Sequence, residues 1–323
     1  MRTLPRIRIA QLPTPVELLP RLTAELGGPT ILVKRDDLTG LAFGGNKTRK
    51  LEYLLAEAQA NGARTIITAG AVQSNHCRQT AAACARVKFD CVLVLSGEKP
   101  SIATGNLLLD HLFNAEIVWT SDEERSLMLQ STFQKAWEAG RRPYLIPYGG
   151  SNTTGAAAYV YALQELLTQG YTPDWIVFAS SSGGTQAGLA AGVKLFNFRG
   201  KVLGISVDET EADLKERVAS LATATTDALG EKTSLTAQDI LVNDNYTGGG
   251  YGIMGAPEIE AIRMFARLEG LLLDPVYTGR AAAGLIDLIR NGHFKHDETV
   301  LFWHTGGTPA IFSDKYSHLI SPL

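Results

Sequence analysis

The stretch "TIITAGAVQSNHCRQTAAACA", residues 65–85, holds the pattern that decides the fold. It opens with a short apolar run at 65–69, which is typical of a buried β-strand. A polar turn follows at 73–76, and an alanine-rich helix is predicted at 79–86. Strand, polar turn and helix form the repeating unit of α/β proteins. In open α/β sheets the turn after a strand is where ligands bind, so this turn is a candidate site.

The same alternation of apolar runs and helical patterns recurs along the chain. Alternation of this length indicates mainly parallel sheets with helices on both faces. The fold class is therefore predicted to be α/β. Strands are predicted at 31–34, 65–69, 91–96, 116–119, 143–147, 175–179, 201–207 and 300–304. Helices are predicted at 79–86, 127–139, 156–168, 186–196, 256–268 and 281–290. The polar stretch 221–238 is expected to hold a helix and a loop.

Composition excludes several classes of protein. The chain has 323 residues, enough for one large or two modest domains, and its net charge of -3 lacks the basic excess of nucleic-acid binders. No apolar run approaches the ~20 residues of a membrane span. Cys77, Cys84 and Cys91 lack metal-ligand spacing and are expected to be reduced and buried. The amino-terminal segment lacks the apolar region of a signal peptide, so we expect a cytoplasmic protein. The cysteine spacing, the net charge and the lack of long apolar runs lead us to expect no metal site and no nucleic-acid or membrane partner.

The segment "LAFGGNKTRKLEYLLAEA", 41–58, crowds three cations into the first turn of a predicted helix, with Asn46 as a plausible N-cap. The helix dipole disfavours cations there by a few tenths to ~1 kcal/mol each. An ordinary surface lysine is one explanation for Lys47. The other is chemical: neighbouring Arg49 and Lys50 lower its amine pKa, and a neutral amine attacks a carbonyl.

Four polar or glycine-rich loops follow predicted strands. Ser74 and Asn75 suit a carboxylate or serve only as helix caps, and His76 is an acid–base group or a structural histidine. The loop 180–185 suits a phosphate, because its glycines allow close backbone approach and its spacing fits neither a Walker loop nor GxGxxG. The segment 304–307 offers a hydroxyl and two glycines at a strand end, or a plain turn.

Two tyrosines on loops, Tyr251 and Tyr277, are able to stack on a ring or act as acids, with ordinary packing as the alternative. A reactive lysine, a phosphate loop and a carboxylate loop together suit pyridoxal 5'-phosphate, whose aldehyde needs a lysine and whose phosphate needs a helix N-terminus. Lys47 would then carry the cofactor, and the phosphate would offset the charge of Lys50.

Long motifs then indicate a family. The chain resembles the D-cysteine desulfhydrase / 1-aminocyclopropane-1-carboxylate deaminase family of pyridoxal-phosphate enzymes, of the tryptophan-synthase-β type, and it is also similar to L-cysteate sulfo-lyases. The resemblance implies PLP fold type II, with two open twisted, mainly parallel sheets. The cofactor would lie between a large domain (1–47 and 156–323) and a smaller inserted domain (48–155). The resemblance also implies a homodimer. The motifs that carry it run from about residue 12 to about residue 312 and include "GGNKTRKLEYL", "TAGAVQSNHCRQTAA", "SSGGTQAG", "GYGI", "LLLDPVYTGRAAAGLIDL" and "HTGGTPA".

The resemblance also implies roles for individual residues. The implied catalytic residues are Lys47, which forms the Schiff base, Ser74, Tyr251 and Tyr277. Around the cofactor, Asn75 would lie beside the phenolic oxygen, Thr305 would lie near the pyridine nitrogen, Thr278 would be a further contact, and the phosphate would be bound by Lys50, Ser182, Gly183, Gly184 and Thr185. The substrate carboxylate would be bound by Ser74, Asn75 and His76. The deaminases carry Glu at the position of Thr278, which favours the desulfhydrase branch here.

The expected function is α,β-elimination on a small amino acid, with D-cysteine giving pyruvate, ammonia and hydrogen sulfide. L-cysteate with release of sulfite is the second alternative, and deamination of 1-aminocyclopropane-1-carboxylate is the third. The non-enzyme alternative is a protein that binds pyridoxal phosphate but catalyses no reaction.

Overall fold

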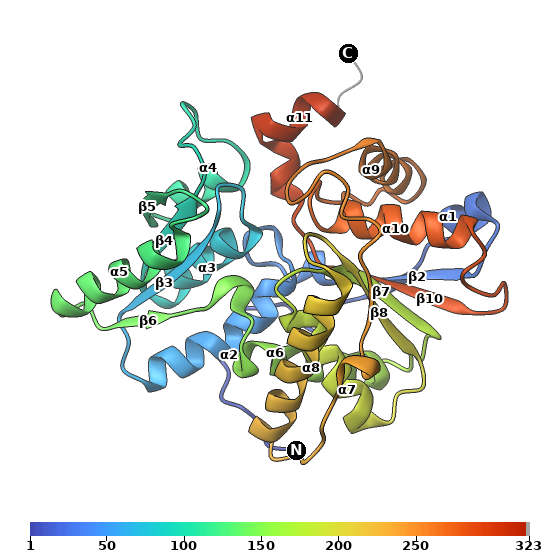
Figure 1. Ribbon diagram of the computed structural model, residues 1–323, viewed down its shortest axis with the longest axis horizontal. Helices are drawn as coiled ribbons and strands as arrows, with labels where there is room; N and C mark the ends of the chain where they lie inside the picture. Colours follow the sequence, from blue (N-terminus) through green and yellow to red (C-terminus); the bar gives the residue numbers. More distant parts are fainter. Residues whose placement is uncertain (321–323) are drawn as a thin grey trace.

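The computed structural model describes residues 1–320 and arranges their strands in two separate sheets (Figure 1). The six-stranded sheet has the order β1-β2-β10-β7-β8-β9, and the four-stranded sheet has the order β5-β4-β3-β6. The pairing of β1 with β2 is antiparallel and the other pairings of both sheets are parallel. The strands are β1 Val16–Leu18, β2 Thr30–Arg35, β3 Thr65–Ala71, β4 Asp90–Ser96, β5 Glu116–Thr120, β6 Pro143–Leu145, β7 Trp175–Ser180, β8 Lys201–Ser206, β9 Leu241–Asn243 and β10 Thr299–His304.

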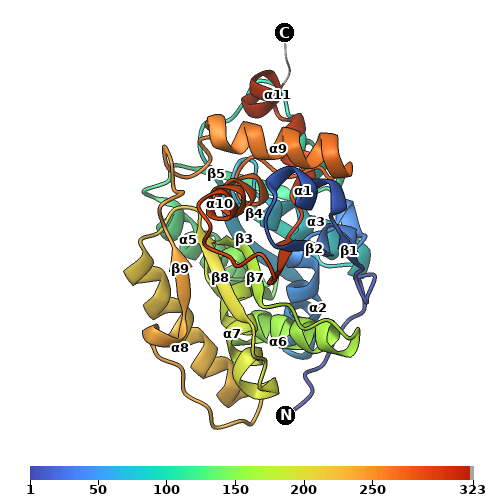
Figure 2. The same ribbon diagram turned by 90° about the vertical axis from the view of Figure 1, so that its right-hand side faces the viewer.

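Helices cover both faces of each sheet, which confirms the predicted fold class (Figures 1 and 2). On the six-stranded sheet, α1, α9 and α10 form one apolar core, and α6 and α7 pack on the opposite face. On the four-stranded sheet, α2, α3 and α4 lie on one face and α5 on the other. The helices are α1 Pro20–Leu26, α2 Asn46–Ala60, α3 Asn75–Val87, α4 Gly105–Leu112, α5 Arg125–Glu138, α6 Thr153–Thr168, α7 Gly184–Phe196, α8 Glu211–Ala228, α9 Ala256–Glu269, α10 Thr278–Arg290 and α11 Asp314–Ile320.

All the strands and helices predicted from the sequence are present, with shifted ends. The three-residue strands β1 and β9 were not predicted, and β6 ends at Leu145 rather than 147 because the chain turns into a 3-10 helix, Tyr148–Gly150. The prediction that Asn46 caps α2 is wrong. Gly45 precedes the helix, and Asn46 is its first residue, with a side chain that points to Thr185 instead.

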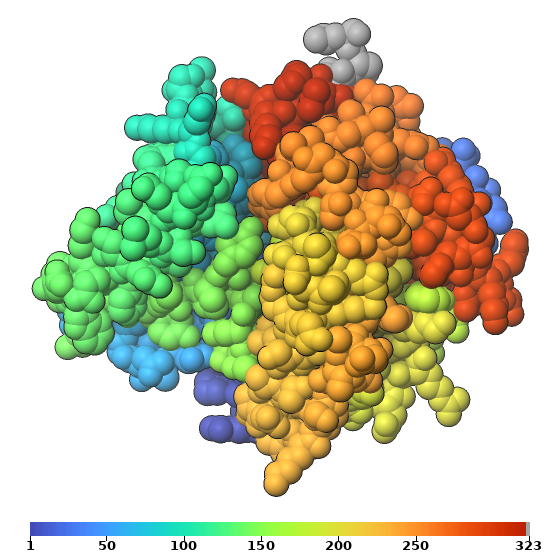
Figure 3. Space-filling model, viewed as in Figure 1, coloured from blue at the N-terminus to red at the C-terminus, as the bar shows by residue number. Residues whose placement is uncertain are grey.

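The four-stranded sheet uses only residues 65–145, within the segment assigned from the sequence to a smaller inserted domain. Its boundaries at 48 and 155 stay a prediction. Figure 3 shows a hollow in the surface where the teal and green part of the chain meets the orange part. The three cysteines are free and buried, as expected. Within residues 1–320, no helix combines the length and the apolar character needed to cross a membrane.

A buried carboxylate joins α2 to the six-stranded sheet. Asp36, directly after β2, has no exposed surface, and it accepts hydrogen bonds from four side chains of distant segments. The donors and their distances are Arg49 of α2 (2.8 Å), Tyr159 of α6 (2.6 Å), Trp303 of β10 (2.8 Å) and Thr14 (3.0 Å). Removal of such a partner leaves an unpaired buried charge, which costs far more than a surface ion pair contributes.

Glu165 of α6 completes this network from the opposite side of the guanidinium. It accepts hydrogen bonds from Arg49 at 2.9 Å and from Lys34 of β2 at 2.7 Å. Burial opposes ionisation of Glu165, but the hydrogen bond and charge of Arg49, followed by those of Lys34, lower its pKa to about 2. Arg49 therefore lies between the carboxylates of Asp36 and Glu165, and α2 is attached to the sheet through it.

We predict that Asp36→Ala lowers the free energy of unfolding by about 3–5 kcal/mol, because Arg49 loses a buried partner. Guanidinium unfolding at neutral pH measures this value. Glu260→Ala, which breaks the half-exposed pair of Glu260 with Arg290, is the matched control and should cost about 1 kcal/mol or less. Equal losses in the two variants would show that the network does not attach α2 to the sheet.

Candidate active site

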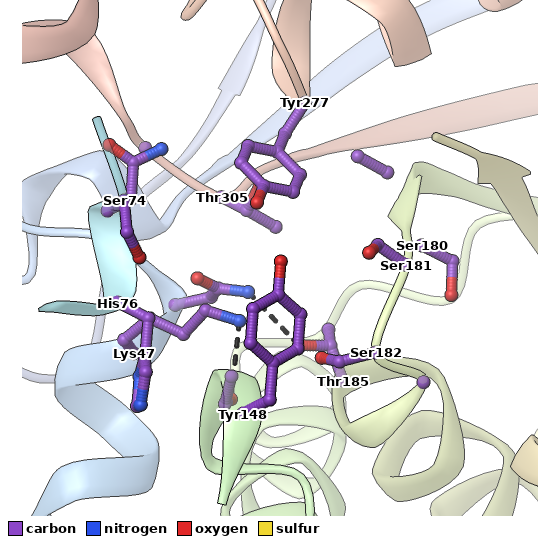
Figure 4. A pocket seen from close by; sticks show the side chains of 16 residues that line it. Lys47, Ser74, His76, Tyr148, Ser180, Ser181, Ser182, Thr185, Tyr277 and Thr305 are labelled. Carbon is purple, nitrogen blue, oxygen red and sulfur yellow. Dashed lines mark hydrogen bonds between the residues drawn. The ribbon is translucent and has the colours of Figure 1, made fainter. Parts of the chain in front are cut away.

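A cavity lies where loops that follow strands of both sheets meet (Figure 4). Loops after β3, β7 and β10 contribute to its wall, together with the first turn of α2 and the 3-10 helix after β6. The carboxyl ends of parallel strands thus converge on one space, as expected for a ligand site of an open α/β sheet. Its lining residues are Asn46, Lys47, Ser74, Asn75, His76, Tyr148, Gly149, Ala179, Ser180, Ser181, Ser182, Gly183, Thr185, Tyr277, Thr305 and Gly306.

Most of the site residues predicted from the sequence lie on this wall, and four do not. Those that line it are Lys47, Ser74, Asn75, His76, Ser182, Gly183, Thr185, Tyr277 and Thr305. Lys50, Gly184 and Tyr251 lie one layer behind, in contact with lining residues, whereas the hydroxyl of Thr278 is directed elsewhere.

The two predicted lysines share one acceptor. The carbonyl of Gly149 receives hydrogen bonds from the amine of Lys47 at 3.3 Å and from the amine of Lys50 at 3.1 Å. Burial lowers the pKa of Lys47 to about 8, so a substantial share of its amine is neutral near physiological pH. Burial and the neighbouring charge of Lys47 lower the pKa of Lys50 well below its ordinary value. The site therefore combines a nucleophilic amine with a second amine, that of Lys50, whose cationic form a bound anion would stabilise.

The amino terminus of α7 forms a narrow cradle beside these lysines. Gly183, in the left-handed region at φ 82°, ends the loop, and α7 begins at Gly184. The N–H of Gly184 donates to the hydroxyl of Ser151 at 3.2 Å, and that hydroxyl lies 2.8 Å from the hydroxyl of Ser182. A Cβ added to Gly184 would lie 2.9 Å from the amine of Lys50. Helix N–H groups, hydroxyls and an amine converge here, which suits a phosphate.

Ser74 caps α3, which is the alternative that the sequence left open, and it also lines the cavity. Its hydroxyl accepts the N–H of Cys77 at 3.2 Å. His76 lies 2.9 Å from the hydroxyl of Thr68 through Nε2, and that hydroxyl already donates its only proton to the carbonyl of Ile146. Nε2 of His76 must therefore donate, which leaves Nδ1 without a proton in the neutral ring.

Burial, followed by the charges of Lys47 and Lys50, lowers the pKa of His76 well below its ordinary value. The ring is therefore neutral, and its Nδ1 is only an acceptor. Such a ring cannot donate a hydrogen bond from Nδ1 to a substrate carboxylate. The role of His76 in carboxylate binding stays a prediction, and it would use the backbone N–H at the start of α3 rather than the ring.

The predicted tyrosines form a pair, with Tyr277 on the cavity wall and Tyr251 behind it. Their hydroxyl oxygens are 2.7 Å apart, and their rings meet edge to face with centroids 6.0 Å apart. Burial raises the pKa of both phenols well above the ordinary value, so both remain protonated and able to donate a proton.

Tyr148 is a third tyrosine of the site, which the sequence analysis missed. It lines the cavity from the 3-10 helix that carries Gly149, and its hydroxyl points toward that of Tyr277 (Figure 4). The guanidinium of Arg125 lies 5.2 Å from the centre of its ring, a cation–π contact. The signal in the sequence was an aromatic residue directly before two glycines at the end of a predicted strand.

Thr278 does not line the cavity, contrary to the direct cofactor contact expected for it. It starts α10, where its hydroxyl donates to the carboxylate of Asp274 at 2.8 Å and its N–H donates to the same oxygen at 2.6 Å. This local pairing across four residues occupies the side chain. Thr305 remains the predicted threonine on the wall, and no carboxylate belongs to the part of the wall formed by residues 1–320.

A family model described as "Pyridoxal-phosphate dependent enzyme" matches residues 7–306. The chain belongs to this family. Pyridoxal phosphate is accordingly its cofactor, as the sequence predicted.

Solved structures agree with the membership in this pyridoxal-phosphate family. A protein described as a homologue of 1-aminocyclopropane-1-carboxylate (ACC) deaminase has 38% sequence identity and a TM-score of 0.89, over 96% of this chain and 94% of that chain. A pyridoxal-phosphate-dependent aspartate racemase has 19% identity and a TM-score of 0.66, over 91% and 90% of the two chains. A hydrogen sulfide-producing enzyme from Fusobacterium nucleatum has 16% identity and a TM-score of 0.66, over 94% and 96%. The last two show a shared fold alone.

The cavity fits pyridoxal phosphate. Lys47 offers an amine with a lowered pKa, and the start of α7 with Lys50 offers a cradle that a side chain at Gly184 would fill. The hydroxyl of Ser180 is buried on the wall and finds no hydrogen-bond partner within residues 1–320. A bound ligand would supply that partner. Lys47 would hold the aldehyde carbon, and the cradle would hold the phosphate.

We predict that borohydride reduction attaches the cofactor covalently to Lys47, as peptide mapping would show. The rate of attachment to cofactor-free protein should rise about fivefold from pH 7 to pH 8 and level off above pH 9, because the neutral amine reacts and its pKa is about 8. A lysine with an ordinary pKa would show an increase of about tenfold per pH unit across this range.

Lys194→Ala, at a lysine that forms an exposed ion pair with Asp239, is the control for Lys47→Ala. Lys47→Ala should lose both covalent attachment and turnover, and the control should lose neither. A reduced adduct on another lysine would contradict the assignment of Lys47.

We predict that Gly184→Ala weakens cofactor binding at least tenfold, because the new Cβ would lie 2.5 Å from Ser151 and would fill the cradle. Titration of the cofactor-free protein with pyridoxal phosphate measures the affinity, and its thermal unfolding reports the cost to the fold. Unchanged affinity in a folded Gly184→Ala variant would place the phosphate elsewhere.

Proposed function

We propose that this pyridoxal-phosphate enzyme is a lyase that catalyses α,β-elimination on a small amino acid, with D-cysteine as substrate. D-cysteine and one water would give pyruvate, ammonia and hydrogen sulfide. The observation that carries the proposal is the uncharged wall near Thr305: no Asp or Glu of residues 1–320 lines the cavity.

The absence of an acid on that wall bears on the choice of reaction. Bound pyridoxal phosphate supplies the electron sink, which is strongest when a neighbouring carboxylate favours a protonated ring. Opening a cyclopropane needs a strong sink, since carbon leaves poorly and ACC has no α-hydrogen. Elimination of sulfide needs a weaker one, since a thiolate leaves readily. Asp274 does not line the wall: its carboxylate accepts hydrogen bonds from backbone N–H groups of its own turn, such as that of Thr278, and it reaches the wall only through Asn75, at 3.5 Å.

The residues of the cavity divide the remaining tasks. Lys47, neutral in part at pH 7, would take the α-proton. Ser74 and the free N–H groups at the start of α3 would hold the substrate carboxylate. Tyr277, backed by Tyr251 at 2.7 Å and kept protonated by burial, would deliver a proton to the departing sulfur.

A substrate panel tests this proposal. We predict sulfide, pyruvate and ammonia from D-cysteine, and a kcat/KM for ACC, measured as 2-oxobutanoate, at least a hundredfold lower. Lys47→Ala, assayed in parallel, gives the background of free pyridoxal phosphate. Comparable kcat/KM for ACC and D-cysteine would contradict the argument from the uncharged wall. Sulfite release from L-cysteate as the dominant activity would contradict D-cysteine as the substrate but would agree with the elimination reaction. Bound cofactor without turnover of any substrate would contradict the proposal that the protein is an enzyme.

A further inference from the structure

Asn75 is held from behind by two buried residues that do not line the cavity. Its carbonyl oxygen Oδ1 accepts hydrogen bonds from the amide of Asn106 in α4 at 2.9 Å and from the guanidinium of Arg78 in α3 at 3.3 Å. Arg78 and Asn106 have no exposed surface, and they also contact each other at 3.0 Å. Three polar side chains therefore form one closed cluster behind the wall of the cofactor site.

A backbone carbonyl determines which way these amides face. Nδ2 of Asn106 lies 2.8 Å from the carbonyl oxygen of Gln73, which only accepts hydrogen bonds. That atom of Asn106 must therefore be the amide nitrogen. The same nitrogen contacts Asn75, so the Asn75 atom it meets must be an acceptor, the oxygen Oδ1.

The NH2 group of Asn75 is consequently directed away from the cluster. It lies 3.5 Å from the carboxylate of Asp274, and a Cβ added to Gly307 would come within 2.6 Å of it. Asn75 belongs to the cavity wall. The group that it offers on that side is a hydrogen-bond donor, suited to an oxygen that carries negative charge.

Arg78 also reaches the segment that carries the reactive lysine. Its Nη2 donates to the carbonyl of Gly44 at 2.8 Å, just before the start of α2. Gly44 is in the left-handed region at φ 64°, and a Cβ there would lie 2.0 Å from the carbonyl of Asp37, so this turn has little freedom to move. One guanidinium thus links the donor of α3 to the turn that leads to Lys47.

We propose that Arg78 and Asn106 are positioning residues that keep the Asn75 amide as a donor toward the cofactor's phenolic oxygen, in a fixed relation to Lys47. This inference rests on the cofactor site and not on the identity of the substrate. A donor at this oxygen stabilises its deprotonated form and strengthens cofactor binding. Loss of the cluster allows the amide to rotate and present its oxygen, which repels the same atom.

Asn106→Asp tests the orientation with almost no change in shape. It replaces the donating NH2 by a carboxylate oxygen that faces the acceptors of Gln73 and Asn75, which favours rotation of the Asn75 amide. Two readouts other than turnover follow: the affinity for pyridoxal phosphate should fall about tenfold or more, and the visible absorption of bound cofactor should shift toward the form with a protonated phenolic oxygen.

Asn114→Asp is the matched control, because it makes the same change of charge on an exposed residue just after α4. Thermal unfolding of the cofactor-free proteins separates lost stability from lost positioning. Affinity and absorption equal to those of the control would overturn the proposal.

Arg78→Lys is a second test that keeps the inference falsifiable if Asn106→Asp does not fold. A single ammonium cannot reach Asn75, Asn106 and Gly44 together, so we expect the same spectral shift and weaker cofactor binding. Arg86→Lys, on an exposed residue of the same helix, is its control. In every variant, a borohydride-reduced cofactor adduct on Lys47 shows that the cofactor site itself is intact. An adduct on another lysine would reject the cofactor site. An unshifted absorption spectrum in folded Arg78→Lys would reject the positioning role alone.

Discussion

The carboxylate of Asp36 is the contact on which the geometry of the site depends. An ionised carboxylate without exposed surface must be compensated by buried partners, and Asp36 obtains them from α2, α6, β10 and the amino-terminal segment. These segments are far apart in sequence, so the chain must close around Asp36 before the charge is satisfied. Arg49, its partner in α2, lies two residues after Lys47. The position of the reactive lysine relative to the six-stranded sheet therefore follows from one buried charge.

The three cations in the first turn of α2 consequently have two different roles. Arg49 is neutralised within the protein by Asp36 and Glu165, and this pairing stabilises the fold. Among residues 1–320, Lys47 and Lys50 have no such carboxylate: both donate to the carbonyl of Gly149, and burial lowers the pKa of each. The unfavourable placement of cations at a positive helix end thus makes physical sense only with an anion beside α7.

The sequence predicted the sheets and the wall of the site because both depend on local signals. Apolar runs of four to seven residues mark buried strands, and the loops after β7 and β10 meet because these parallel strands are neighbours in one sheet. The loop after β3 comes from the other sheet, and the packing of the two sheets brings it to the same space. The strands β1 and β9, with three residues each, are too short for such a signal. Thr278 was predicted at the cofactor from the family resemblance, whereas its side chain pairs with Asp274 at the start of α10, a contact that the resemblance did not indicate.

Tertiary contacts explain the other residues that the sequence analysis missed. Asn106 meets Asn75 across 31 residues and Gln73 across 33, and nothing in either segment alone indicates that α4 packs against α3 at that point. Such contacts supply orientation rather than reactivity, and residue type does not reveal orientation. An amide at the start of a helix is equally able to donate and accept; the donor Arg78, together with the carbonyl of Gln73 acting through Asn106, determines which group of Asn75 faces the cavity. The chemistry of the site is therefore encoded in its loops, whereas the direction in which its groups point is encoded in the packing of α3 and α4 behind them.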